Sequence, residues 1–248
     1  MIYLKNSKEI EIMRQAGKIA AAALKEIEKH IKIGVGTRDL DQIAEKVFEG
    51  SGAEASFKRV EGYQYCICAT PNDWVVHGLP GDYKLKNGDL IGIDLGAYYK
   101  GYHSDMAHTY VVGDSEAEKK KFLKVGEKAL WEAIREVKIG NHIGDVSNVI
   151  QTTVEGDGYS VIRELVGHGV GKELHEDPLV PGVGTKGAGP EIREGMVLAI
   201  EVIYSMGKPE LALLADGWTI VTKDKSLSGL FEQTVAVTKK GPVVLTQI

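Results

Sequence analysis

Residues 160–248 constrain the fold most, because their apolar residues come in short runs separated by glycine-rich loops. From residue 160 onward these runs cover residues 161–166, 196–204, 217–222, 231–238 and 242–246. Short apolar runs bounded by glycine or other turn-forming residues are typical of β-strands. We therefore expect this part of the chain to contribute strands to a sheet.

Residues 1–159 combine amphipathic helix patterns with further strand-like runs. Helices are expected over residues 7–31, after Thr37, from Ser115 to Gly140 and over 144–156, and strands near 64–70, 74–77, 90–95 and 102–112. Asn6 or Ser7 suits the cap of the first helix, and Ser115 with Glu118 matches a capping box. The two parts together predict an α+β fold, with helices packed on one face of an antiparallel sheet. No repeat or linker marks a boundary, so we expect one domain over residues 1–248.

Charge, hydropathy and cysteine usage argue against several classes of protein. The chain has 35 acidic and 30 basic side chains, and a net charge of −5 does not favour nucleic acid or anionic membranes as partners. It lacks the basic-then-apolar layout of a signal peptide and the roughly 18 apolar residues of a membrane span. Cys66 and Cys68 are poorly spaced for a disulfide. We expect a monomer in the reducing cytoplasm, without membrane or stable nucleic-acid partners.

The stretch "IGIDLGAYYKGYHSDMA", residues 91–107, reads as a β-hairpin that carries two aspartates. If the turn centres near Tyr99 and Lys100, Asp94 and Asp105 face each other with β-carbons about 4.5–5.5 Å apart. Like charges in that position destabilise a sheet. A shared proton, a nearby Arg or Lys, or a bound cation could each neutralise them.

Other ionisable residues interrupt apolar or glycine-rich runs. Glu201 interrupts "MVLAIEVIY" and Glu232 interrupts "GLFEQTVAV", where a charged group is costly unless it is paired or bound to metal. His168 lies in "VGHGVG", His175 in "ELHEDP" and His77 in "WVVHGLP". The glycines around His168 allow close backbone approach and leave its imidazole accessible.

Each of these residues alone has a structural interpretation. A lone histidine is usually a hydrogen-bonded structural residue, a strand glutamate usually faces water, and a hairpin aspartate usually serves the turn. Cys66 and Cys68 are best read as small buried hydrophobes. Four carboxylates in apolar strands, however, need a common explanation. Oxygen ligands with one imidazole suit one or two divalent first-row ions, so the residues alone predict metal-assisted hydrolysis, with a cation between the two aspartates.

The order of the candidate ligands resembles the metal-binding set of the pita-bread metallopeptidases. The order is Asp94, Asp105, His168, Glu201 and Glu232, with spacings of 11, 63, 33 and 31 residues. Within that family, "GAEASF", "NDWVVHGLPGDYKLKNGD", "GHGVGKELHEDP" and "DGWTIVTKDKSLSGLFEQT" are similar to methionine aminopeptidases of the short, type I form. The similarity runs from about residue 3 to the C-terminus. It implies a single-domain pita-bread fold.

The resemblance also implies two divalent metal ions, with cobalt, manganese, iron, zinc or nickel as candidates. Asp94 would chelate one ion. Asp105 and Glu232 would bridge both ions, while His168 and Glu201 would complete the other site. Glu201 is also expected to be catalytic.

Two histidines and an apolar pocket are implied around the substrate. His77 and His175 would contact the substrate and stabilise the tetrahedral intermediate, so both are expected to be catalytic. The pocket for the side chain would include Tyr63, Cys68 and Trp218.

Several positions depart from the family pattern without removing a ligand. Val202 replaces a proline, Gln233 a histidine, Leu174 an aromatic residue and Gly182 an asparagine. Leu230 stands where proline-specific peptidases of this fold have an arginine.

The leading prediction is an enzyme that removes the N-terminal methionine of peptides and nascent proteins with small second residues, with the ribosome as a candidate partner. One alternative is a proline-directed aminopeptidase of the same fold, since "DLGAYYKGYHSD" has some of that character. A second alternative is a non-catalytic binding protein that keeps the fold. Such relatives generally lose ligands, whereas all five are present here.

Overall fold

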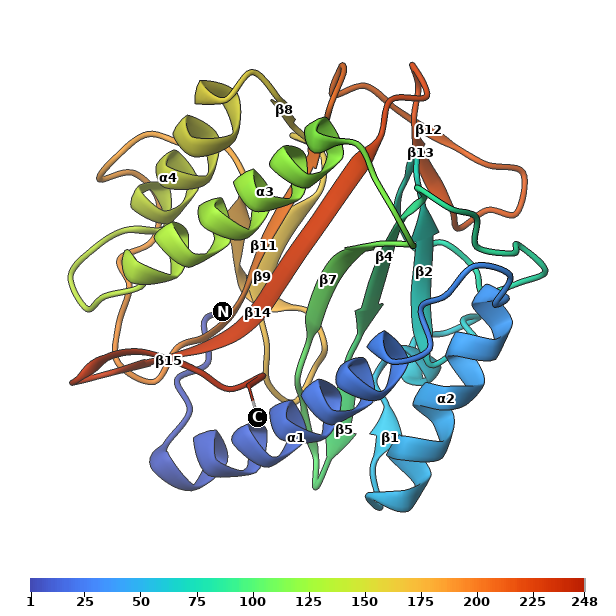
Figure 1. The fold of residues 1–248 in the computed structure, drawn as a ribbon. Helices are drawn as coiled ribbons and strands as arrows, with labels where there is room; N and C mark the ends of the chain where they lie inside the picture. Colours follow the sequence, from blue (N-terminus) through green and yellow to red (C-terminus); the bar gives the residue numbers. More distant parts are fainter. Residues whose placement is uncertain (248) are drawn as a thin grey trace.

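The computed structural model describes residues 1–247, and Figure 1 shows helices packed along one side of a curved antiparallel sheet. The helices are α1 (Ser7–Glu28), α2 (Thr37–Gly50), α3 (Ala117–Arg135) and α4 (Ile143–Gly156), with a short 3-10 helix η1 (Phe57–Arg59). The strands are β1 (Glu54–Ala55), β2 (Ile67–Pro71), β3 (Trp74–Val76), β4 (Leu90–Leu95), β5 (Ala97–Tyr99), β6 (Tyr102–His103), β7 (Met106–Val111), β8 (Ser160–Val161), β9 (Val166–Gly169), β10 (Glu176–Pro181), β11 (Val197–Ser205), β12 (Leu211–Leu213), β13 (Ile220–Thr222), β14 (Ser228–Thr238) and β15 (Gly241–Val244).

The largest sheet is built from both halves of the chain. Within residues 1–247 it has nine strands in the order β10-β9-β11-β14-β7-β4-β2, with β15 added to β14 and β8 added to β11. Two three-stranded sheets, β1-β5-β6 and β12-β13-β3, account for the other strands. The recorded strand pairs of the large sheet are all antiparallel, as the sequence predicted.

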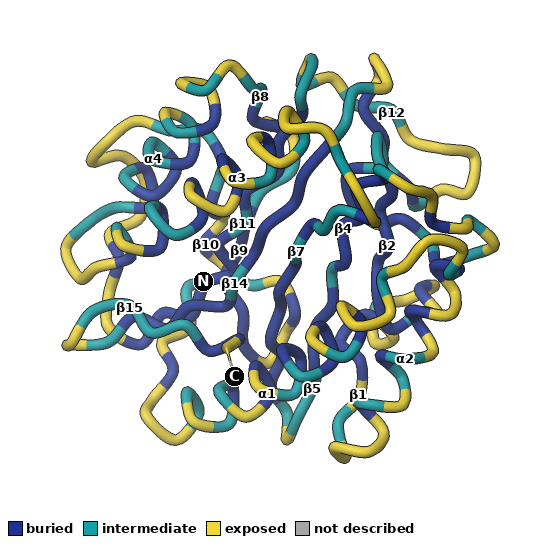
Figure 2. The backbone as a smooth tube through the Cα atoms, in the orientation of Figure 1, coloured by how far each residue is buried: buried dark blue, intermediate teal, exposed yellow. Residues whose placement is uncertain are grey.

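The four long helices cover one face of the large sheet in two pairs. Helices α3 and α4 contact β14, β11 and β10, while α1 and α2 contact β5, β4 and β2. Figure 2 shows the central strands buried along most of their length. The predicted packing of helices on one face is therefore confirmed. Among residues 1–247, no helix combines the length and the apolar character needed to cross a bilayer.

Side-chain hydrogen bonds of Asn6 and Glu9 fix the start of helix α1. Asn6 Oδ1 accepts hydrogen bonds from the backbone of Lys8 and Glu9, and the Glu9 carboxylate accepts one from the backbone of Asn6. This reciprocal capping box satisfies backbone donors that the first turn leaves free. The helix ends at Glu28, three residues before the predicted end at residue 31.

The capping box predicted at Ser115 and Glu118 is wrong. Glu116 occupies the N-cap position of α3 without a side-chain cap hydrogen bond, and the Ser115 hydroxyl is buried without a partner. The helix also ends at Arg135, before the predicted stop at Gly140. Burial of an apolar face holds this helix, with Phe122 among its inaccessible residues.

The register of the aspartate hairpin differs from the prediction by two residues. Lys100 and Gly101 form the turn and have positive φ angles of 47° and 89°. The turn therefore lies one residue later than predicted, and Asp94 pairs with Ala107 rather than with Asp105. The predicted opposition of the two aspartates is wrong, although a two-residue shift keeps both side chains on one face of the sheet.

The predicted strand over residues 102–112 is split into β6 and β7. Strand β6 pairs with β5 in a separate sheet, whereas β7 pairs with β4 and β14 in the large sheet. Ser104 and Asp105 lie at the break between them. Asp105 therefore directly precedes β7, and it lines a cavity.

Candidate metal centre

Cross-strand pairing places three of the candidate ligands in one row across the large sheet. Glu201 pairs directly with Glu232, Glu232 with Ala107, and Ala107 with Asp94. Cys68 pairs with Asp94 at the end of the row. Directly paired residues point to the same face of a sheet, so the three carboxylates converge although up to 138 residues separate them in sequence (94 to 232).

A second row, two residues away, carries the other two candidate ligands. His168 pairs with Ala199, and Ala199 pairs with Thr234. The Thr234 hydroxyl accepts a hydrogen bond from the Asp105 backbone N–H at 2.8 Å and donates one to the Asp105 carbonyl at 2.6 Å. Because side chains alternate along a strand, both rows face the same side.

A second threonine makes the mirror arrangement on the other side of the β7–β14 contact. The Thr109 hydroxyl accepts from the Leu230 N–H and donates to the Leu230 carbonyl, both at 2.9 Å. Between Thr109 and Thr234, β7 and β14 pair at Glu232 with Ala107 and at Gln233 with Met106. We call this short junction the threonine seam. It fixes the backbone on which Asp105 and Glu232 stand.

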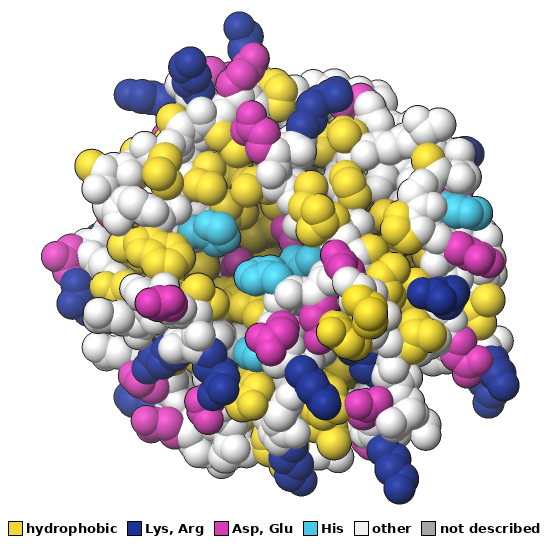
Figure 3. Space-filling model, turned by 180° about the vertical axis from the view of Figure 1, so that it is seen from behind, with side chains coloured by type: hydrophobic (Ala, Val, Ile, Leu, Met, Phe, Trp, Pro, Cys, Tyr) yellow, Lys and Arg dark blue, Asp and Glu magenta, His cyan; other side chains and the backbone are white. Residues whose placement is uncertain are grey.

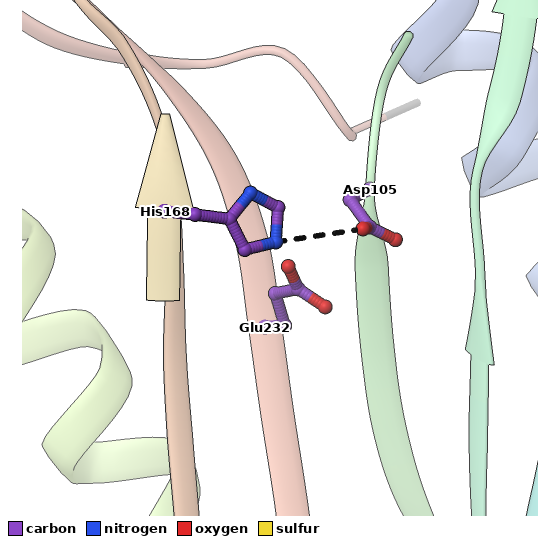
Figure 4. A group of neighbouring side chains, drawn as sticks. All are labelled: Asp105, His168 and Glu232. Carbon is purple, nitrogen blue, oxygen red and sulfur yellow. Dashed lines mark ion pairs between the residues drawn. The ribbon is translucent and has the colours of Figure 1, made fainter. Parts of the chain in front are cut away.

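Five side chains thus form what we call the ligand cluster, namely Asp94, Asp105, His168, Glu201 and Glu232. Figure 4 shows three of them pointing toward a common space from β9, β14 and the start of β7. Asp105, His168 and Glu232 are buried and offer ligand atoms that all lie within 4.8 Å of one another. The His168 Nε2 atom lies 3.9 Å from Asp105 Oδ2 and 3.8 Å from Glu201 Oε1.

The protonation state of His168 follows from one hydrogen bond. Its Nδ1 atom lies 2.9 Å from the Gly169 carbonyl oxygen, which can only accept, so Nδ1 carries the proton. Burial lowers the pKa of the ring to about 4. The neutral ring therefore presents the lone pair of Nε2 to the carboxylates, as a metal-binding imidazole does.

The carboxylates are not satisfied by protein partners. One oxygen each of Asp94, Asp105 and Glu232 is buried without a hydrogen bond. Such atoms are costly to bury unless a proton or a cation neutralises them. Carboxylate oxygens with a neutral imidazole are the donor set that divalent first-row ions prefer. The cluster therefore fits a divalent cation.

Burial raises the pKa values of all four carboxyl groups, and repulsion from neighbouring carboxylates adds to the rise for Asp94, Glu201 and Glu232. Burial raises the pKa of Asp105 to about 7, and burial with the Asp105 charge raises that of Glu201 to about 8. The pKa values of Asp94 and Glu232 are raised well above their ordinary values, first by burial and then by the neighbouring carboxylates. A divalent cation reverses this effect, because it replaces the protons that the cluster otherwise binds.

A cavity of about 360 Å³ opens over the ligand cluster. Figure 3 shows this face of the molecule hollowed, with histidine and hydrophobic side chains around the hollow and acidic side chains inside it. One end of the cavity is apolar, and its walls include Phe57, Tyr63, Cys68, Leu174 and Trp218.

The apolar end is held by hydrogen bonds and ring contacts. The Tyr63 hydroxyl donates to the Ile67 carbonyl at 2.8 Å, and its ring meets that of Trp218 edge-on at 5.1 Å. Asp41 accepts hydrogen bonds from the backbone of Cys66 and Ile67 at 2.7 and 3.1 Å, which anchors the start of β2. The sequence-predicted pocket residues Tyr63, Cys68 and Trp218 therefore all line one end of this cavity.

His77 and His175 lie on the cavity wall, outside the ligand cluster. His77 has a φ of 55°, a region in which a residue other than glycine is uncommon and which often marks a functional position. The His175 ring meets that of His168 edge-on, with centroids 4.4 Å apart. Burial lowers the pKa values of both His77 and His175. Two neutral imidazoles thus face the space beside the carboxylates.

Sequence reasoning missed several cavity walls. Ile203 and Leu230 pair with each other and lie two residues from Glu201 and Glu232, so strand alternation could have placed them on the cavity face. Phe57 and Val60 come from η1 and the loop after it, where no pattern indicated them. Leu165 is a further wall residue.

The departures from the family pattern fall mostly away from the cavity. Val202 is inaccessible and belongs to the core under α3 and α4. Gln233 accepts a hydrogen bond from the Thr246 hydroxyl at 2.5 Å. Of the four, Leu174 is the one that lines the cavity.

Comparison with known proteins identifies the family. The model of metallopeptidase family M24 matches residues 11–239, which is most of the chain. The chain belongs to metallopeptidase family M24. The resemblance stated from its motifs is therefore confirmed, and the chain is an enzyme of the hydrolase class whose family uses a divalent metal.

The similar M24 proteins include methionine aminopeptidases that match over their full length. Methionine aminopeptidase 1 of Bacillus subtilis is 46% identical over 248 residues, and the methionine aminopeptidase of Clostridium perfringens is 44% identical over 248 residues, with all of each chain covered. The crystal structure of the Thermotoga maritima methionine aminopeptidase matches all of both chains with a TM-score of 0.98 at 43% identity. The prolidase from Pyrococcus furiosus matches with a TM-score of 0.81 at 26% identity, covering 99% of this chain and 65% of that one.

Proposed function

We propose that this M24 metallopeptidase is a methionine aminopeptidase, which hydrolyses the first peptide bond of peptides and nascent proteins that begin with methionine. The observation that carries the proposal is the apolar end of the cavity, which lies directly beside the ligand cluster. An apolar pocket next to a carboxylate cluster suits a substrate with an unbranched hydrophobic side chain and a free amine. The full-length methionine aminopeptidase relatives support the same activity.

We propose that the ligand cluster holds two divalent ions, with Asp94 on one ion, Asp105 and Glu232 shared, and His168 and Glu201 on the other. The orphaned oxygens of Asp94, Asp105 and Glu232 and the free Nε2 of His168 support these roles. When bound, the ions supply Lewis acidity toward the scissile carbonyl and lower the pKa of water. Cobalt, manganese, iron, zinc and nickel are the candidates.

The remaining steps fall to side chains of the cavity. Glu201 keeps 12% of its side chain exposed, so its carboxylate can take a proton from water in the cavity and pass it to the leaving amine. His77 and His175 can donate hydrogen bonds to the oxygen on which charge develops during attack. Tyr63, Cys68 and Trp218 hold the methionine side chain and exclude water from it. With both histidines on the cavity wall, small second residues fit best.

A panel of peptides tests the proposed activity. The metal-loaded protein should cleave Met-Ala-Ser at least 100-fold faster than Leu-Ala-Ser, Met-Leu-Ser or an Xaa-Pro peptide, where 100-fold is on the order of the discrimination that a hydrophobic pocket achieves. Preference for the Xaa-Pro peptide would favour a proline-directed aminopeptidase, which the similarity to the prolidase fold keeps as the second candidate. Failure to bind any divalent ion would favour a non-catalytic binding protein.

We also propose that residues 1–248 act as one catalytic domain, as a monomer in the cytoplasm close to the ribosome. The family match over residues 11–239 supports a single domain. The free, buried thiols of Cys66 and Cys68 suit a reducing compartment. Nascent proteins as substrates favour a place of action near the ribosome. Sedimentation with ribosomes and size-exclusion chromatography test these points.

A further inference from the structure

One ion pair in residues 1–247 stands apart from the others. Lys5 Nζ lies 2.5 Å from Glu176 Oε2, and each side chain is 5% exposed. In every other Lys or Arg pair with a carboxylate in this part of the chain, both side chains are at least 33% exposed. A buried ion pair rarely adds stability over an apolar pair of the same volume, because both charges lose their hydration. Its role is therefore better sought in what it positions.

Glu176 directly follows His175 in the chain and begins β10. Its Oε2 atom binds Lys5, while its Oε1 atom accepts a hydrogen bond from the Glu173 backbone N–H at 3.3 Å. Within the same turn, the Gly171 N–H donates to the Glu173 carbonyl at 3.1 Å. The Glu176 carboxylate thus closes the turn that delivers His175 to the cavity.

The backbone is shaped around the Lys5 side chain. A β-carbon on Gly171 would lie 2.4 Å from Glu176 Oε1 and 2.6 Å from Lys5 Cε, both closer than real contacts allow. On the other side, the Lys5 N–H donates to the Gly195 carbonyl at 2.7 Å, and a β-carbon on Gly195 would lie 2.8 Å from the Lys5 carbonyl oxygen. Glycines on two sides therefore form a socket for this lysine between the turn of His175 and the residues that precede β11.

The backbone of Lys5 is held in place as well, because Lys5 directly precedes Asn6, the N-cap residue of α1. Within that cap, Glu9 Oε1 accepts a hydrogen bond from the Tyr102 hydroxyl at 2.6 Å. The next residue, His103, donates its N–H to the Gly171 carbonyl at 2.8 Å. The start of α1 is thus connected to the Gly171 turn by two routes, one through Lys5 and one through Tyr102.

From these contacts we infer that Lys5 is a positioning residue for His175. Its ammonium group holds the Glu176 carboxylate, and this carboxylate holds the turn from which His175 reaches the substrate. The inference rests on the proposed function, since it assigns Lys5 a part in the work of His175. Lys5 itself does not line the catalytic cavity.

A double-mutant cycle tests the inference. Lys5→Met fills the socket without charge and leaves the Glu176 carboxylate unpaired. We expect kcat for Met-Ala-Ser to fall about 10- to 100-fold, the range that a misplacement of about 1 Å produces, with KM changed less than about twofold. In a His175→Ala background the same substitution should change kcat less than about twofold, because the group that Lys5 positions is absent. Lys5→Arg should recover most of the lost kcat.

Metal content and circular dichroism on the same preparations show whether each variant keeps its cluster and fold. Lys121→Met is the matched control, because both side chains of the Lys121–Asp157 pair are at least 33% exposed and neither residue lines the catalytic cavity, so its kcat should equal that of the parent. If Lys5→Met does not fold, the same double-mutant cycle with His175→Ala is measured with Glu176→Gln, which removes the charge of the other partner in the ion pair.

Additive losses of kcat from Lys5→Met and His175→Ala would overturn the inference and leave the proposed function standing, as would unchanged kcat in Lys5→Met alone. Full activity of His175→Ala would overturn the proposed role of His175 and the inference with it. A loss confined to metal content or thermal stability, with normal kcat per metal-loaded enzyme, would reduce the ion pair to a structural contact.

Discussion

The two faces of strands β11 and β14 are equally buried but differ in how their polar atoms are satisfied. On the helix side, Ile200, Val202 and Tyr204 are inaccessible, and the Tyr204 hydroxyl donates to the Phe122 carbonyl at 2.6 Å. On the cavity side, Glu232 is 3% exposed and leaves one carboxylate oxygen without a partner. Burial alone therefore does not reveal the site. Unsatisfied polar atoms do, because the helix face completes its hydrogen bonds within the protein, whereas the cavity face leaves carboxylate oxygens that a proton or a cation must neutralise.

The largest expected effect comes from neutralising one of the two residues that we propose are shared by both metal ions. Asp105→Asn and Glu232→Gln should each abolish peptidase activity and lower the metal content, because a neutral amide cannot balance the charge of two dications. Activity and metal stoichiometry are measured on the same preparation. Full activity in either variant would remove that residue from the ligand cluster.

The control for this change lies on the other face of β11. Ile200→Ala should lower the free energy of unfolding by about 2–5 kcal/mol, because it leaves a cavity in the core, while the folded fraction keeps its metal and its kcat. A loss of metal in this variant would mean that the two faces are not independent.

His77 should show the next largest effect. His77→Ala should lower kcat about 10²–10³-fold, the usual cost of removing a hydrogen-bond donor to developing charge, and should leave metal content unchanged. Normal kcat with normal metal would make His77 structural, and lost metal would make it a ligand.

Metal removal should change how stability depends on pH. Asp105 and Glu201 have folded-state pKa values of about 7 and about 8, above their ordinary values of 3.8 and 4.5. The folded metal-free protein therefore binds protons more tightly than the unfolded chain. Its free energy of unfolding should fall as pH rises from about 4 to 8, by up to about 1.4 kcal/mol per pH unit for each proton.

Urea unfolding at pH 6, 7 and 8 measures this effect, with chelator in one series and Mn²⁺ in the other. The Mn²⁺ series should lose less stability with rising pH, because the cation replaces the protons. Asp105→Asn in chelator is the matched control and should show a shallower slope. Equal slopes in all series would contradict the raised pKa values.

The smallest expected effect concerns the apolar end of the cavity. Cys68→Trp should raise KM for Met-Ala-Ser severalfold, because it fills the pocket beside Tyr63 without replacing a ligand. Metal content should stay normal. Unchanged KM would show that Cys68 is not a wall of the methionine pocket.

The fold class and the residues that converge on the cavity could be predicted because their positions are marked in the local sequence pattern. Glu201 and Glu232 interrupt apolar runs, and the structure pairs them directly. The hairpin aspartates were correctly taken to share a face, but their register was predicted two residues off. The turn lies at Lys100 and Gly101, one residue later than predicted. The sequence pattern does not distinguish the two positions, because tyrosines flank the turn on both sides.

What could not be predicted depends on contacts between distant parts of the chain. Lys5 and Glu176 are 171 residues apart, and Lys5 looks like any surface lysine in sequence. Phe57 reaches the cavity from a 3-10 helix that has no periodicity to reveal its inward face. The capping box at Ser115 failed for a related reason, since the burial of Phe122 and its neighbours, rather than a cap, holds the helix there.

The threonine seam bears on how firmly the two halves of the large sheet are joined. Strand β14 pairs with β11 at nine positions but, within residues 1–247, with β7 at two, although this second contact joins the two halves of the large sheet. The side chains of Asp105 and Glu232 come from opposite sides of that joint, so repulsion between them acts where two residue pairs of the backbone ladder join the half-sheets. A cation held by both carboxylates would therefore fasten one half-sheet to the other. We therefore expect removal of the metal to weaken the protein first along this joint between the two half-sheets.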